Sequence, residues 1–142
     1  MRDLLDASVW LPLSAPDHVH HARARQYWDQ EAAEELVFCR LTALALLRYL
    51  TNKRLLGDRA LSSAESWRAL GAWLSLPNIK LVDEPLGVNE YLGRWSQELN
   101  LGAGAWTDAY LAAFAAAGDC RLIAFDGDFE RYEGIKFLHL KK

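Results

Sequence analysis

Cysteine is scarce in this sequence. Only Cys39 and Cys120 occur, and each lies in a short apolar run, ELVFC and DCRLIAF. Two isolated cysteines in such surroundings are typical of buried thiols, whereas a disulfide framework or a zinc site needs clustered ligands. The sequence therefore predicts two buried free thiols.

Long apolar runs and strong charge are lacking as well. The chain has no run of 18 apolar residues and begins with no apolar run of signal-peptide length, so we expect a cytoplasmic protein without a membrane segment. Its net charge of −3 argues against a general nucleic-acid binder but leaves room for a local basic patch. No linker or internal repeat divides the 142 residues, a length that fits one domain, residues 1–142.

Short apolar segments alternate with helical patterns along the chain. Five segments are typical of buried strands: Leu4–Leu5, Leu36–Cys39, Ile79–Val82, Arg121–Phe125 and Lys136–Leu140. Such alternation predicts an α/β fold with a parallel sheet of about five strands and helices on both faces.

Cap residues and apolar spacing predict the helices and the loops between them. The chain is expected to turn at Asp6–Ser8 and to form a loop over Pro12–Pro16. The first predicted helix runs from Asp17 to about Glu34, and the second from a Thr42 cap through the basic residues Arg48, Lys53 and Arg54. A third helix runs from the Ser62–Glu65 capping box through Leu74. The last two run from Val88 to Leu99, with Gly102 closing the helix, and from Trp106 to Gly118.

Three aspartates are expected at one edge of this sheet. Asp6 ends the first strand, Asp126 follows the fourth, and Asp108 lies in the first turn of the helix before that strand. Each acid alone is also compatible with a cap or a tight turn. Ligands of open α/β sheets, however, bind at the carboxyl ends of strands, and crowded carboxylates repel unless they recruit a cation. The pattern therefore indicates a Mg²⁺ site at Asp6, Asp108 and Asp126, with Asp128 as a further candidate ligand.

Four segments carry a resemblance to a known family: LLDASVWL at 4–11, LTALALLRYLTN at 41–52, WTDAYLAAFA at 106–115 and RLIAFDGDF at 121–129. With the helical spacing between them they resemble a PIN-domain ribonuclease of the VapC toxin type. The resemblance implies a single PIN-like domain that cleaves RNA as a homodimer and is silenced by a VapB-like antitoxin.

The same resemblance implies roles for individual residues. Asp6, Asp108 and Asp126 would be catalytic and would hold Mg²⁺ or Mn²⁺, which activates water for phosphodiester hydrolysis. Ser8 and Thr107 would orient the carboxylates, and Arg48 would contact RNA phosphates.

Two positions depart from the pattern of the family. Ala43 stands where relatives carry an acid or a glutamine at the start of the second helix, on the side expected to face the metal, and Ala124 stands where a serine or threonine is common. The alternative is therefore a catalytically weak or inactive PIN-like module that binds RNA or a protein partner. Six tryptophans are also too many to assign entirely to the core, so surplus apolar surface is expected to form a dimer or antitoxin interface.

Overall fold

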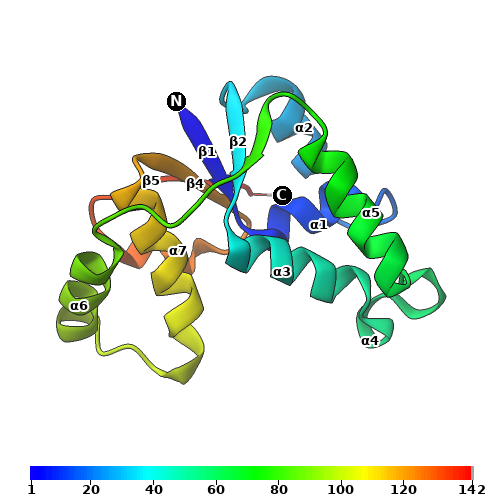
Figure 1. The fold of residues 1–142 in the computed structure, drawn as a ribbon. Helices are drawn as coiled ribbons and strands as arrows, with labels where there is room; N and C mark the ends of the chain where they lie inside the picture. The colour runs from blue at the N-terminus through cyan, green and yellow to red at the C-terminus, as the bar shows by residue number, and fades with distance from the viewer. Residues whose placement is uncertain (142) are drawn as a thin grey trace.

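A parallel β-sheet forms the centre of the molecule (Figure 1). The computed structural model describes residues 1–141. Within them, five strands lie in the order β3-β2-β1-β4-β5, and every neighbouring pair is parallel, as predicted. The strands are β1 (Arg2–Leu5), β2 (Glu35–Phe38), β3 (Ile79–Leu81), β4 (Cys120–Ala124) and β5 (Lys136–His139).

Helices cover both faces of this sheet, as the alternation of strands and helices predicts. Those of residues 1–141 are α1 (Ala7–Ser14), α2 (His21–Gln30), α3 (Arg40–Leu50), α4 (Lys53–Leu56), α5 (Ser63–Leu74), α6 (Val88–Leu99) and α7 (Trp106–Ala117). Figure 1 shows α6 and α7 on one side of the strands and α1, α2, α3 and α5 on the other. None of the helices in this part of the chain is long and apolar enough to span a membrane.

Consecutive strand residues point to opposite faces, which explains why these strands are apolar throughout. Leu4 and Leu122 pack against the α6–α7 side, whereas Leu5 and Ile123, the next residue in each strand, pack against the α1–α3 side. The two predicted thiols, Cys39 and Cys120, are free and buried. The sheet thus separates two apolar layers that belong to one α/β domain.

The predicted loop over Pro12–Pro16 is wrong, because α1 begins directly after β1 and continues to Ser14 with Pro12 inside it. Burial of Val9, Trp10 and Leu13 offsets the backbone hydrogen bond that a proline cannot donate. The helix predicted from Asp17 is also shorter, since α2 runs only from His21 to Gln30.

Three other predicted helix ends lie elsewhere. Cys39, not Thr42, occupies the cap position of α3, and the Thr42 hydroxyl accepts a hydrogen bond from the Cys39 N–H over 3.0 Å. Lys53 and Arg54 belong to the separate short helix α4. Asn100, not Gly102, adopts the left-handed conformation after α6, with φ 49°. The Ser62–Glu65 capping box is confirmed.

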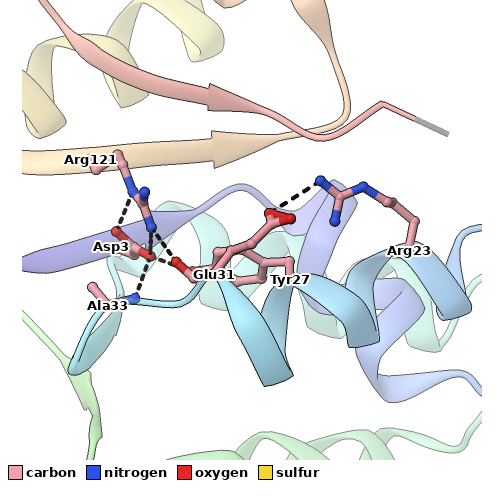
Figure 2. A network of polar contacts seen from close by, with 6 residues as sticks. All are labelled: Asp3, Arg23, Tyr27, Glu31, Ala33 and Arg121. Atoms are coloured by element: carbon pink, nitrogen blue, oxygen red, sulfur yellow. Dashed lines mark hydrogen bonds and ion pairs between the residues drawn. The ribbon is translucent and has the colours of Figure 1, made fainter.

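A buried ionic network ties β1 to β4 at the end of the sheet where these strands begin (Figure 2). The Asp3 carboxylate is fully buried and accepts two hydrogen bonds from the Arg121 guanidinium, at 2.9 and 2.8 Å. It also accepts bonds from the Tyr27 hydroxyl and the Ala33 N–H. Burial raises the pKa of Tyr27, which keeps its hydroxyl protonated and donating. Four hydrogen bonds therefore stabilise the charge of this carboxylate.

We expect Arg121→Met to destabilise the protein by about 3–5 kcal/mol, because the Asp3 charge stays buried without its cation. Urea denaturation of the two proteins measures this difference. Asp119→Asn is the matched control: it removes a carboxylate that pairs with Lys136 at the surface, and asparagine tolerates the positive φ of residue 119. Equal unfolding midpoints for the two variants would contradict the assigned role of the network.

Candidate active site

The three predicted aspartates line one cavity at the carboxyl ends of β1 and β4. This cavity has a volume of about 290 Å³, and its wall includes Asp6, Asp108 and Asp126. The cavity opens between β1 and β4. The chain leaves β1 toward β2 on one side and returns to β4 on the other, so this is the switch point of the sheet. Ligand sites of open α/β folds usually lie at such a point. Ser8, Thr107 and Arg48 also line this cavity, hereafter the acid cavity.

Asp6 is held by the junction between β1 and α1. Its N–H donates to the Ile123 carbonyl of β4 over 2.9 Å, and its side chain caps α1 by accepting the Ser8 N–H over 3.4 Å. The Ser8 hydroxyl in turn accepts the Phe125 N–H over 3.3 Å. Ser8 therefore connects the turn that carries Asp6 to the end of the strand that precedes Asp126.

Asp126 is positioned by one contact within its own turn and by support from a distant strand. Its carboxylate accepts the Asp128 N–H over 2.9 Å, which starts the 3₁₀ turn Gly127–Arg131. The His139 ring on β5 donates to the Phe125 carbonyl over 2.9 Å. A Cβ atom at residue 127 would approach this ring to 2.9 Å, so only glycine fits there without displacing the histidine.

Burial, together with the charges of neighbouring acids, raises the pKa of two of these aspartates. Burial and the charges of Asp6, Asp126 and Asp128 raise the pKa of Asp108 from 3.8 to about 6. Burial, with the Asp126 charge as a lesser cause, also raises the pKa of Asp6. Asp128 itself is exposed and is not part of the cavity wall, so its influence on Asp108 is through its charge.

The donor chemistry of the cavity suits a hard divalent cation, because carboxylate oxygens are the preferred ligands of Mg²⁺. Within residues 1–141, however, no group of three or more acidic, histidine or cysteine side chains is already arranged to hold a metal ion. The acids share a cavity but do not form a finished cage. Since Mg²⁺ usually keeps several waters, contact with one or two carboxylates satisfies its preference.

The α3 side of the cavity supplies a cation and apolar groups. Arg48, in the last turn of α3, is exposed, and its guanidinium lies 5.9 Å from the centre of the Tyr49 ring. Leu41, Thr42, Ala45 and Tyr49 form the rest of this wall. Thr107 faces them from the first turn of α7.

The two departures from the family pattern lie in the core. Ala43 is fully buried beside the apolar cluster that contains Leu5 and Trp10, and it is not part of the cavity wall. The expectation that this side chain faces the acids is therefore wrong: α3 turns Ala45, not Ala43, toward the cavity. Ala124, the last residue of β4, is fully buried on the α6–α7 side.

A second hollow, of about 440 Å³, lies between the loop after α1 and the α3–α4 region. Its wall is mainly apolar, with Leu50, Leu55 and Leu61. Its one carboxylate, Asp17, is paired with Arg59 over 2.9 Å. The hollow is larger than the acid cavity, but its wall contains no group of acids comparable to Asp6, Asp108 and Asp126.

Comparison with known proteins places this chain in a family. The sequence profile of the PIN domain matches residues 4–135. Ribonuclease VapC41 of Mycobacterium tuberculosis is 37% identical over 144 residues, which cover 98% of this chain and 99% of that protein. Among solved structures, the sarcin–ricin-loop-cleaving toxin VapC20 of M. tuberculosis has a TM-score of 0.69 at 19% identity, covering 94% of this chain and 95% of its own. VapBC-1 of nontypeable Haemophilus influenzae has a TM-score of 0.72 at 17% identity, with both chains fully covered. The chain belongs to the PIN-domain family, in its group of VapC ribonucleases.

Proposed function

We propose that this chain is a metal-dependent endoribonuclease and the toxin of a VapBC-type toxin–antitoxin pair. The observation that carries the proposal is the acid cavity, in which Asp6, Asp108 and Asp126 meet and the pKa of Asp108 rises to about 6. Carboxylates gathered at a cost in stability need a compensating cation. A relative of this length and identity that is named a ribonuclease supports RNA as the substrate.

In the proposed reaction Asp6, Asp108 and Asp126 would hold Mg²⁺ or Mn²⁺, which would activate water and offset charge on the phosphate. Asp6 is fixed for this task by the Ser8 N–H, and Asp126 by the Asp128 N–H. Thr107 lines the same cavity as Asp108 from the first turn of α7, and its hydroxyl would orient that carboxylate. Arg48, exposed at the cavity mouth, contacts an RNA phosphate.

A VapB-like antitoxin and a second copy of the chain are the proposed protein partners, and the cytoplasm is the proposed compartment. Solved structures with this fold include VapBC complexes, among them one from Salmonella typhimurium. Val19 and Leu55 are exposed beside the 440 Å³ hollow and supply apolar surface for a protein partner. A non-catalytic module would gain nothing from clustered, mutually repelling acids, so we do not favour that alternative.

We expect Asp108→Asn to abolish metal-dependent RNA cleavage, because it removes one of the three proposed ligands. Its effect on the metal-free protein should be opposite: stability equal to the wild type or higher, since one repelling charge is lost. The folded-state pKa of about 6 lies above the unfolded value of about 3.8, so metal-free wild-type protein loses stability as pH rises between these values. Thermal melts should show that the melting temperature falls less between pH 4.5 and pH 7 in the variant than in the wild type.

Asp58→Asn serves as the control, because it removes an exposed carboxylate far along the chain from the proposed ligands. Substantial metal-dependent cleavage by the Asp108 variant would remove this residue from the site.

We expect Asp126→Asn and Asp128→Asn to differ in their response to metal. At Mg²⁺ or Mn²⁺ concentrations about 100 times the Kd, wild-type protein gains about 2.7 kcal/mol of stability from binding. Asp126→Asn should lose most of this gain, whereas Asp128→Asn should keep it, because only Asp126 lines the cavity. Calorimetric Mn²⁺ titration with thermal melts measures both effects. If both variants lost the same amount of metal-dependent stability, Asp128 would be a direct ligand.

We expect glutamate at two neighbouring positions of α3 to act in opposite ways. Ala45→Glu adds a carboxylate to the cavity wall and should tighten Mn²⁺ binding. Ala43→Glu buries a charge in the apolar layer and should cost several kcal/mol of stability without tightening metal binding. Parallel melts and metal titrations decide the matter, and tighter binding by the Ala43 variant would refute the placement of α3.

A further inference from the structure

Two exposed tryptophans lie outside everything assigned so far. Among the six tryptophans, all of which fall within the described residues, Trp67 is 63% exposed and Trp106 is 47% exposed, whereas Trp10 and Trp95 are fully buried. Trp67 belongs to α5 and Trp106 begins α7. Exposing so large an apolar side chain is costly unless something covers it.

Trp106 lines a hollow that adjoins the acid cavity. This hollow, of about 400 Å³, is bounded by Arg40, Leu44 and Tyr110 besides Trp106. It shares Leu41 and Thr107 with the acid cavity, so the two spaces meet beside Asp108.

Trp67 lines another hollow, toward the opposite end of α3 from Trp106. This space, of about 580 Å³, lies between α3 and α5, and its wall includes Leu47, Ser63 and Ser66. It shares Arg48 with the acid cavity. The three spaces therefore adjoin one another along α3, with the Trp106 hollow toward the start of this helix and the Trp67 hollow toward its end. In Figure 1, α7 lies toward the start of α3 and α5 toward its end.

The charges along this surface have a definite order. Arg40 begins α3 in the Trp106 hollow, and Arg48 lies eight residues later, at the junction with the Trp67 hollow. Eight residues of α-helix span about 12 Å. Arg48 thus lies between the acids and the Trp67 hollow, whereas Arg40 lies in the Trp106 hollow and also borders Asp83 and Glu84.

We propose that this surface is a groove for single-stranded RNA, in which Trp106 and Trp67 each stack on one base, on opposite sides of the phosphate that is cleaved. Arg40 and Arg48 contact the flanking phosphates. Aromatic side chains bind bases that are free of a duplex, and guanidinium groups bind the backbone between them. The inference rests on the proposed function, because it takes the acid cavity as the place of cleavage.

Charge and continuity favour RNA over a protein as the occupant. An apolar protein face would cover the tryptophans but would leave both arginines and the three carboxylates against it. An RNA strand matches the arginines with phosphates and the tryptophans with bases. Duplex RNA does not fit this scheme, because its bases are already stacked on one another.

The test measures binding without cleavage in the Asp108→Asn background, with a fluorescein-labelled 12-nucleotide oligoadenylate as probe and anisotropy as readout. Trp106→Leu and Trp67→Leu should each weaken binding about 5- to 150-fold, the effect of losing one stacked base. Trp→Phe at either position should restore most of the affinity, since a ring remains. The same probe with abasic sites should bind all variants equally.

Leu86→Ala is the matched control, because Leu86 is 97% exposed and lies in none of the three spaces. Arg40→Gln and Arg48→Gln should each lower the dependence of log affinity on log salt by about 0.7, whereas the tryptophan variants should leave that slope unchanged. Thermal melts establish that every variant is folded.

Binding by both Trp→Leu variants at the level of Leu86→Ala would overturn the groove. If the original chain still cleaves RNA and Asp108→Asn does not, the proposed function survives that result. Conversely, a chain that binds oligoadenylate through its tryptophans but cleaves no RNA with Mg²⁺ would refute the proposed function and leave the groove standing. Sedimentation adds a third outcome: a dimer that Trp106→Leu converts to monomer, with RNA affinity unchanged, assigns the Trp106 surface to a second copy and overturns the proposal.

Discussion

The pairing of β1 with β4 determines where the functional groups of this protein lie. These strands are distant in sequence but adjacent at the centre of the sheet, with Leu4 opposite Leu122 and Leu5 opposite Ile123. At one end the Asp3–Arg121 pair fixes the register, and at the other the Asp6 N–H continues the ladder to the Ile123 carbonyl. If the pairing of β1 with β4 slipped by one residue, the side chains of the slipped strand would exchange faces. The carboxylate that follows this strand, Asp6 or Asp126, would then move away from the cavity. The same pairing therefore holds the core together and brings Asp6 near Asp126.

The two ends of this strand pair treat buried charge in opposite ways. Asp3 is surrounded by donors and a guanidinium, and its charge is satisfied in the folded chain. Asp6 and Asp108 have raised pKa values because burial and neighbouring acids disfavour their charged forms. The first arrangement contributes to stability, whereas the second opposes it and persists because the surrounding fold is stable. Unsatisfied charge of this kind is characteristic of functional sites.

Sequence reasoning succeeded where one local pattern decides the outcome. Apolar strand residues, the capping box at Ser62 and the acids next to strand ends each carry their own signal, and the parallel sheet and acid cavity follow from them. It failed where tertiary contacts override that signal. Pro12 indicates a loop, yet burial of Trp10 keeps it inside α1. The cap of α3 lies at Cys39, three residues before Thr42, and this difference rotates Ala43 into the core and Ala45 toward the acids.

The support that His139 gives to the Asp126 turn is beyond sequence reasoning altogether. His139 lies 13 positions after Asp126 and reaches the turn only because β5 pairs with β4. Gly127, whose backbone is not unusual, is required by the approach of that ring. Neither residue stands in a motif that would identify its role.

The distribution of charge around the acid cavity implies an order of events in the proposed reaction. The carboxylates lie at the centre and the arginines at the margins, so an RNA phosphate meets repulsion at the point of cleavage and attraction on either side. A divalent cation held by Asp6, Asp108 and Asp126 would reverse the sign of the charge at the centre. An RNA strand would then be attracted at the acids as well as at the arginines, and the phosphate nearest the carboxylates would be the one to enter the cavity. The carboxylates that would hold the ion would thus also set the position of the cut, while the flanking arginines and tryptophans would contact the neighbouring nucleotides.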